Sequence, residues 1–170
     1  MDTLEAIRLK RAVRAFTELP IEQPEIITIL NAGRRAQSSK NSQPWNFVAI
    51  NDKVILQGLA GCGINASHLA GAALGVAIIH REPGEQFQLL FDIGQCAAYM
   101  QLAAWEIGIG SCLASIYDPD KARQVLGFPT ELTIRFAISF GYPQDMDILA
   151  RPPRSGGRRP LEQIVHWNKW

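Results

Sequence analysis

The run Ser38-Ser39-Lys40-Asn41-Ser42-Gln43-Pro44-Trp45-Asn46-Phe47-Val48-Ala49-Ile50 is the most informative part of the chain, because a polar turn in it leads directly into an apolar segment. Small hydroxyl and amide side chains favour a turn, since they hydrogen-bond to nearby backbone. The apolar segment predicts a strand over residues 46–51. The turn can also hydrogen-bond a flat heteroaromatic ligand. We therefore interpret the turn as a binding loop and Trp45 as a core residue.

Helical and strand patterns alternate on both sides of this junction. Asp2 and Glu5 form a capping box for a helix that ends near Lys10. Pro24 suits the first turn of a helix over residues 25–35. The later patterns predict a helix over 52–59, a buried strand over 72–79, a helix over 86–107, a strand over 112–116, a helix over 118–126 and a strand over 132–140. This alternation predicts an α/β fold, also classified as α+β, in which helices cover both sides of a sheet.

Residues 86–107 carry the longest helical pattern, and apolar side chains surround most of it. A helix that is apolar on most sides is buried on most sides, which in one small domain places it at a subunit interface. Charged residues make up only 19% of the chain, against about 25% in typical domains. We therefore expect residues 1–170 to form a single domain of an oligomer. Residues 144–170 would be an arm that packs on the domain or on the partner subunit.

Composition argues against several classes of function. A net charge of +1 favours no nucleic-acid partner. The longest apolar run, residues 69–79, is shorter than the roughly 20 residues of a membrane span. Cys62, Cys96 and Cys112 form no Cys-x-x-Cys pair, and the histidines lack metal-ligand spacing, so we expect neither a disulfide framework nor a metal site. The N-terminus lacks a secretion signal, and we expect a soluble protein of the cytoplasm.

Basic residues gather at two places that are far apart in the sequence. Lys10, Arg11 and Arg14 lie at the end of the first expected helix, and Arg158 and Arg159 lie in the tail. Arginine supplies charge-assisted, bidentate donors to an anionic phosphate. For the first cluster taken alone, a solvated basic helix end, favoured by the helix dipole, is the simpler interpretation.

Three segments resemble, in family order and over nearly the whole chain, the nitroreductase family of flavin mononucleotide (FMN) enzymes. They are Lys10-Arg11-Ala12-Val13-Arg14-Ala15-Phe16, the run that begins at Ser38, and Gly156-Gly157-Arg158-Arg159-Pro160-Leu161-Glu162-Gln163-Ile164-Val165. The resemblance implies a mostly antiparallel central sheet flanked by helices, in a homodimer with a long interface helix. It also implies an oxidoreductase that holds FMN, accepts hydride from NADH or NADPH, and reduces a nitroaromatic, a quinone or a similar small molecule by a ping-pong mechanism. The flavin then carries the chemistry, so no catalytic side chain is expected.

The resemblance assigns roles to the N-terminal cluster. Lys10 and Arg11 match the family's phosphate-side pair, and Arg14 matches a cation near the flavin pyrimidine ring. Such a cation would stabilise negative charge on the reduced ring. Ala12 replaces the usual serine, so one hydrogen bond to the phosphate or the ribityl chain should be missing. The family pattern makes phosphate the favoured partner of the tail arginines as well.

The binding loop matches the family at Ser38, Ser39 and Asn41, and departs from it at Gln37, where the family has proline. In the family this loop reaches the flavin of the partner subunit, so the active site requires a dimer. Asp92, on the long expected helix, is interpreted as solvated or capping rather than catalytic.

Two further segments match flavin contacts of the family. Asn65 and His68 correspond to a polar pair, although a lone asparagine more often caps a helix and a lone histidine more often lies on the surface or in the core. Leu113-Ala114-Ser115-Ile116 corresponds to the segment beside the ring. There a backbone N–H of Ser115 or Ile116 would approach the nitrogen that accepts hydride. For the side chains of this segment, a plain buried strand end is the alternative.

Two other functions stay open. The first is a flavin-binding sensor or storage protein with little turnover, which the two departures from the family motifs would favour if they weaken flavin binding. The second is a dinucleotide-binding module at Gly61-Cys62-Gly63-Ile64-Asn65-Ala66, with Glu82 and Glu85 about 20 residues further on. Residues 51–60 before this motif have a helical pattern, so we interpret the match as chance or a turn.

Overall fold

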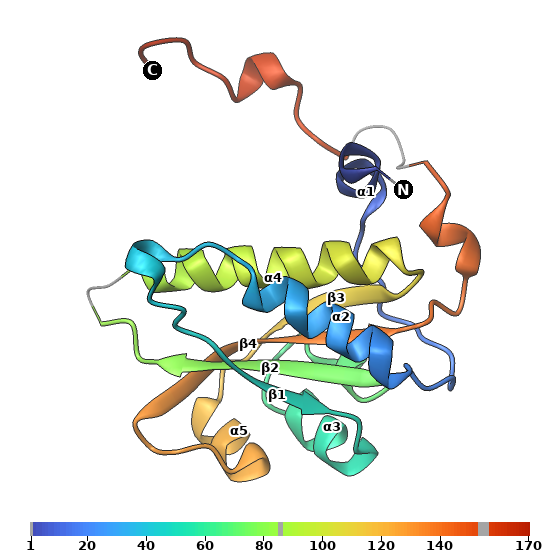
Figure 1. The fold of residues 1–170 in the computed structure, drawn as a ribbon, viewed down its shortest axis with the longest axis vertical. Helices are drawn as coiled ribbons and strands as arrows, with labels where there is room; N and C mark the ends of the chain where they lie inside the picture. The colour runs from blue at the N-terminus through green and yellow to red at the C-terminus, as the bar shows by residue number, and fades with distance from the viewer. Residues whose placement is uncertain (1, 85–86, 153–156) are drawn as a thin grey trace.

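The computed structural model describes residues 2–84, 87–152 and 157–170, and Figure 1 shows their arrangement. The helices are α1 (Thr3–Leu9), α2 (Gln23–Arg34), α3 (Lys53–Ala60), α4 (Gln88–Glu106) and α5 (Pro119–Leu126). The strands are β1 (Asn46–Ile50), β2 (Leu74–Arg81), β3 (Gly110–Ser115) and β4 (Leu132–Gly141). Short 3-10 turns lie at Ser39–Asn41, Ser67–Leu69, Met146–Leu149 and Leu161–Gln163. Glu85, Gln86 and Gly156, which belong to the sequence patterns above, lie outside the described residues.

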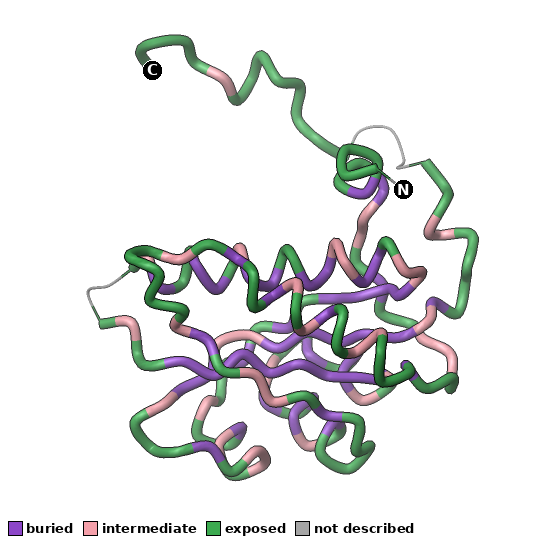
Figure 2. Tube along the Cα trace, viewed as in Figure 1, coloured by how far each residue is buried: buried purple, intermediate pink, exposed green. Residues whose placement is uncertain are grey.

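The strands form one antiparallel sheet in the order β1-β2-β4-β3. This confirms the mostly antiparallel central sheet that the resemblance implies. The central strands β2 and β4 are buried along most of their length, as Figure 2 shows. A strand covered on both faces has no polar face to present, which explains the continuous apolar run in β2. The edge strand β3 keeps one side free, and the candidate site is built there.

Helices cover both faces of the sheet, as the alternating pattern predicted (Figure 1). On one face α2 and α4 pack through a core that includes Ile29, Ile93 and Met100. On the other face α3 and α5 pack through a second core that includes Leu56. Trp45 belongs to the first core, so its interpretation as a core residue is confirmed.

Helix starts follow the capping residues of the sequence. Asp2, Asp52 and Asp118 each accept backbone N–H groups from the first turn of a helix, which satisfies donors that the helix itself leaves unpaired. The N-cap of α2 is Glu22, which forms a capping box, so α2 starts slightly earlier than predicted. β2 and α4 start slightly later than predicted.

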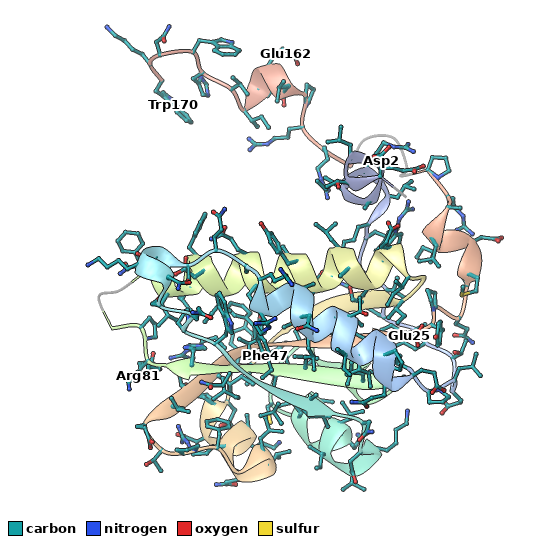
Figure 3. All side chains as sticks on the ribbon, viewed as in Figure 1. Asp2, Glu25, Phe47, Arg81, Glu162 and Trp170 are labelled. Atoms are coloured by element: carbon teal, nitrogen blue, oxygen red, sulfur yellow. The ribbon has the colours of Figure 1, made fainter. Side chains whose placement is uncertain are left out.

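The chain after β4 first packs on the N-terminal region and then leaves the domain. Ile148 and Leu149 pack against a small cluster of Leu9, Val13 and Trp105. Residues 157–170 extend past α1 and away from the sheet, and Figure 3 shows the side chain of Trp170 far from it. None of the helices in the described ranges has the length and apolar character that crossing a bilayer requires.

Candidate functional site

The basic segment after α1 lies along the free edge of β3. The Val13 N–H donates to the Ser111 carbonyl at 2.9 Å. Two glycines that pair across β3 and β4 permit this close approach. A Cβ on Gly110 would lie 2.8 Å from the Val13 Cβ, and one on Gly141 would lie 2.8 Å from the Phe16 ring. The glycines therefore place the basic residues of the segment beside β3.

The first two basic side chains of this segment point to different elements. Lys10 Nζ donates to Gln101 Oε1 on α4 and lines an apolar cavity of about 380 Å³ between α1, α4 and β3. Burial lowers the pKa of Lys10. Arg11 Nε donates to the Leu9 carbonyl at 3.1 Å, and Arg11 Nη2 donates to the Arg151 carbonyl. Arg11 thus ties the start of the tail to the end of α1.

Arg14 lies near the Cys112 thiol, whose electrostatic environment Lys10 also affects. It lines a second cavity, of about 420 Å³, between the basic segment and the chain after β4. Gln144 and Asp145 contribute polar groups to this cavity, whereas Ala12 contributes only a methyl group. Burial raises the pKa of the Cys112 thiol, against the opposing effect of the neighbouring Arg14 charge. Ala12, which replaces the serine usual in the family, therefore lines this cavity.

His68 is buried in the turn Ser67–Leu69 with one ring nitrogen unpaired. Its Nδ1 lies 2.7 Å from Ser139 Oγ, and Ser139 Oγ donates to the Cys112 carbonyl at 3.3 Å. The Ser139 hydroxyl therefore links the His68 ring to the backbone of β3. Nε2 is buried and has no hydrogen-bond partner among the described residues. Burial, reinforced by the charge of Arg14, lowers the pKa of His68.

The turn at residues 61–66 docks on the end of β3. A Cβ on Gly63 would lie 2.2 Å from the carbonyl oxygen of Ser115. Asn65 is exposed on this turn. The turn follows α3, whereas a dinucleotide-binding motif follows a strand. Glu82, the acid proposed for the ribose, pairs instead with an arginine of β4 at 2.7 Å. The interpretation of the motif as a turn is confirmed.

β3 presents backbone groups at its free edge beside these residues. The Ile116 N–H donates to the Arg135 carbonyl of β4 at 2.9 Å. Because N–H groups alternate in direction along an antiparallel strand, the Ser115 N–H points to the free edge. Ala114 is buried, while the exposed side chain of Leu113 lines the 380 Å³ cavity. From the sequence we expect the backbone N–H of Ser115 or of Ile116 to approach the flavin. The Ile116 N–H is already bonded to β4, whereas the Ser115 N–H faces outward.

The binding loop, residues 38–43, is held by a hydrogen bond to α4 and by several hydrogen bonds within itself. The Ser39 N–H donates to Asp92 Oδ2 at 2.9 Å, and the Gln43 N–H donates to Ser38 Oγ at 2.9 Å. The interpretation of Asp92 as solvated is wrong, because its side chain is buried. Asp92 does not cap α4 either, since it lies within this helix and its carboxylate accepts a backbone N–H of the binding loop.

The binding loop and the basic segment lie at opposite ends of α4 within one chain (Figure 1). Asp92 holds the loop near the start of this helix, and Gln101 contacts Lys10 near its end. Positions 92 and 101 are about 14 Å apart along the axis, at about 1.5 Å per residue. Within one chain the basic segment, His68 and Ser115 are all placed along β3, whereas Ser38, Ser39 and Asn41 lie at the far end of α4.

The tail arginines are also apart from this group. Arg158 and Arg159 are exposed, and Arg158 Nη1 donates to the Gly157 carbonyl at 2.9 Å. Neither has a hydrogen bond or an ion pair to the basic segment in the part of the chain that the structure describes. No cluster of three or more histidine, cysteine or acidic side chains suited to a metal ion occurs there either.

Three polar residues of the site were not anticipated in these roles. They are Asp92, which holds the loop, Gln101, which holds Lys10, and Ser139, which hydrogen-bonds His68. Each of them is a buried polar residue of α4 or β4. A buried polar side chain needs a partner, and a polar residue at a position that the apolar pattern places in the interior was the available signal.

The chain matches the family model described as "Nitroreductase family" over residues 7–62 and 60–142. It is 26% identical to an NADH dehydrogenase of Thermus thermophilus, with 98% of this chain and 96% of that protein covered. It is also 26% identical to an NADPH-flavin oxidoreductase of Vibrio harveyi, with 99% of this chain and 75% of that protein covered. The solved structure of an FMN-dependent nitroreductase from Clostridium difficile matches with a TM-score of 0.87 at 25% identity, covering 99% of this chain and 100% of that one. Since the family model spans the chain from α1 to the end of β4, the protein belongs to the nitroreductase family.

Proposed function

We propose that this protein is an FMN-dependent oxidoreductase that accepts hydride from NADH or NADPH and reduces a nitroaromatic, a quinone or a similar small molecule by a ping-pong mechanism. The observation that carries the proposal is that the basic segment, the unpaired His68 Nε2 and the outward Ser115 N–H are all placed along β3, in a chain of the nitroreductase family. The similarity to the NADPH-flavin oxidoreductase of Vibrio harveyi and to the FMN-dependent nitroreductase of Clostridium difficile supports it. Bound FMN supplies the ring that accepts hydride and passes electrons on.

The cations of the site suit a phosphate and an electron-rich ring. Lys10 and Arg11 bind the phosphate through charge-assisted hydrogen bonds, and Arg158 and Arg159 add to them when the tail is docked. Arg14 places a fixed positive charge beside β3, where it stabilises negative charge on the reduced ring. With a methyl group at position 12, phosphate binding depends more on these charges than on a side-chain hydroxyl.

The neutral groups of the site suit a flat ring with polar edges. A buried polar atom such as His68 Nε2 costs free energy while it is unpaired, and a hydrogen bond to a polar edge of the ligand recovers that cost. Asn65 exposes its amide on the neighbouring turn. Ser115 offers its backbone N–H at the strand edge, and the exposed side chain of Leu113 offers an apolar surface.

The active enzyme, in this proposal, is a homodimer whose sites combine both subunits. Leu90, Gly94 and Ala98 of α4 line the 380 Å³ cavity, so α4 keeps an apolar face that its own subunit leaves uncovered. Apolar surface of this kind marks an interface. A two-fold dimer supplies the binding loop of one subunit to the basic segment of the other. The tail, with Trp167 and Trp170 exposed, packs on the partner.

The first test is the visible absorbance spectrum of the purified protein, followed by identification of the heat-released chromophore. A flavin spectrum with FMN in the supernatant supports the proposal, and a colourless protein that takes up no added FMN overturns it. Steady-state oxidation of NADH and NADPH with several acceptors then separates an enzyme from a flavin-binding sensor or storage protein, which would turn over slowly with all of them. The three cysteines are free and buried, which suits the reducing cytoplasm where we place this activity.

A mixed dimer tests whether the site is shared. One subunit carries Arg14→Ala and the other carries Asn41→Ala, so each has one defect. If the loop acts on the partner subunit, both defects fall in one site and the other site is intact. The mixed dimer then binds one FMN with wild-type affinity. If the loop acts within its own subunit, both sites are defective and tight binding is lost, which would contradict the shared site.

A further inference from the structure

We infer that Asp92 is a positioning residue, through which α4 of one subunit holds the binding loop in the shape that reaches the partner subunit's flavin. This inference rests on the proposed function. Asp92 is only 4% exposed and lies behind the loop, where its Oδ2 accepts the Ser39 N–H at 2.9 Å. Asp92 therefore affects FMN binding by positioning Ser39 and its neighbours, and not by touching FMN itself.

The carboxylate of Asp92 is buried without a cation. It forms no ion pair with any of the described residues. Burying a carboxylate in this way costs free energy, and a charge-assisted hydrogen bond from one backbone N–H offsets only part of the cost. An apolar residue would serve the packing of α4 at least as well. The loop that Asp92 holds is what explains its presence.

That loop has a conformation that most residues avoid. The φ angles of Lys40 and Asn41 are 54° and that of Gln43 is 45°, in the left-handed region where residues other than glycine are uncommon. Such residues persist where other contacts hold them, and they gather at binding sites. All side chains from position 39 to position 43 are exposed, so the loop adds little to the core of its own domain.

The anchor connects the loop to the helix that carries the uncovered apolar face. Asp92 lies in the second turn of α4, and Figure 1 shows the loop beside this end of the helix. Because α4 is the proposed interface helix, the hydrogen bond fixes the loop relative to the partner subunit. Ser38, Ser39 and Asn41 are then held at a set distance from the partner's site.

The test compares Asp92→Leu, Asp92→Asn and the control Asp52→Ala in the full-length protein. Leucine has the same number of side-chain heavy atoms and the same branching at Cγ. It removes the acceptor and an unpaired buried charge, so the thermal stability of the FMN-free protein should be unchanged or raised. Asparagine keeps a side-chain oxygen for the Ser39 N–H. Asp52→Ala removes the N-cap of α3 on the other face of the sheet, which lowers stability without touching the loop.

We expect Asp92→Leu to weaken FMN binding by about tenfold or more in a fluorescence titration. It should also speed tryptic cleavage after the exposed Lys40 in the FMN-free protein, without loss of stability. Asp92→Asn should lose less than the leucine variant in both measurements. Asp52→Ala should lose stability and keep its FMN affinity.

Three results would overturn the inference. In the first, Asp92→Leu binds FMN as tightly as the wild type, whatever happens at Lys40. In the second, Asp92→Leu loses stability and FMN affinity together, which would assign the carboxylate to the fold rather than to the loop. In the third, the wild-type protein itself binds no FMN, and the proposed function then fails together with the inference. The wild-type titration comes first, so that this last result is recognised.

Discussion

Two buried histidines make the stability of the protein depend on pH. Burial lowers the pKa of both His68 and His80. At His68 the positive charge of Arg14 lowers the pKa further. At His80 the Arg81 carbonyl and Glu82 act in the opposite direction, but burial has the larger effect. As the pH falls below about 6.5, the unfolded chain takes up protons before the folded chain does. The free energy of unfolding therefore has its full value above that pH. Below it, the free energy of unfolding falls by up to about 1.4 kcal/mol per pH unit for each histidine, until the folded-state pKa is reached.

Replacing one of these histidines measures its contribution to the pH dependence of the free energy of unfolding. His80 Nδ1 donates to the Arg81 carbonyl at 2.6 Å, and we have given His80 no part in ligand binding. We expect His80→Leu to remove one histidine's contribution, so that stability falls less steeply between about pH 7.5 and 5.5. Urea unfolding of the FMN-free protein at several pH values measures both slopes. Equal slopes in the variant and the wild type would contradict the assignment.

The turn at residues 61–66 approaches β3 so closely that position 63 has no room for a side chain. In Gly63→Ala the new Cβ would lie 2.2 Å from the Ser115 carbonyl oxygen, and backbone on both sides must then move. We expect a loss of stability of about 1–3 kcal/mol. Gly71→Ala is the matched control, because its Cβ would meet nothing within 4 Å. Denaturant unfolding compares the two variants. Equal stabilities would mean that the turn does not dock on β3 as described.

The role of a residue could be predicted when it depends on neighbouring residues in the sequence. It could not be predicted when it depends on a hydrogen bond to a residue far away in the sequence. Trp45 as a core residue follows from its position between a polar turn and a strand. His68 and Ser139 are 71 residues apart, and Ser39 and Asp92 are 53 apart. No local pattern joins such pairs, because only the packing of α4 and the pairing of strands bring them together.

Among the elements, the basic segment depends on the paired glycines at the ends of β3 and β4. In Gly110→Ala the new Cβ would lie 2.8 Å from the Val13 Cβ, so the segment must lift from the strand. We expect a loss of stability of about 1–3 kcal/mol together with weaker FMN binding, since Lys10 and Arg14 move with the segment. Unfolding and FMN titration are measured on the same preparation, with Gly71→Ala again as the control. Unchanged FMN affinity in a destabilised variant would separate the segment from cofactor binding.

The helices and strands were predicted with small errors at their ends, while the strand order was not predicted from residue patterns. Periodicity and capping residues act over a few positions, and they located α4 and β4 well. The order β1-β2-β4-β3 places β4 between two strands that precede it in the sequence. Such pairing is decided by which apolar faces meet in three dimensions. The antiparallel arrangement was expected only because of the family resemblance.

For the whole molecule, assembly and FMN binding should be lost together. Ala98 lines the cavity on the uncovered face of α4 and is exposed. We expect Ala98→Glu to produce monomers, because a two-fold interface would bury the new charge twice. FMN affinity should fall with it, since each monomer then lacks a partner's binding loop. Light scattering and FMN titration on the same sample measure both properties.

The control for this variant is Val54→Glu, which places the same charge on α3, where Val54 is 81% exposed. This variant should keep both the dimer and its FMN. A monomeric Ala98→Glu protein that binds FMN with wild-type affinity would disprove the shared site.

The exposed tail has an optical consequence. Of the four tryptophans in the sequence, Trp45 and Trp105 are buried, whereas Trp167 is 84% exposed and Trp170 is 101% exposed. An indole ring emits at shorter wavelength when it leaves water for an apolar environment. Docking of the tail on a partner subunit, as proposed, would therefore shift the emission of the two exposed indoles to the blue. The chain thus carries its own fluorescent label for assembly, which can be followed without adding a dye.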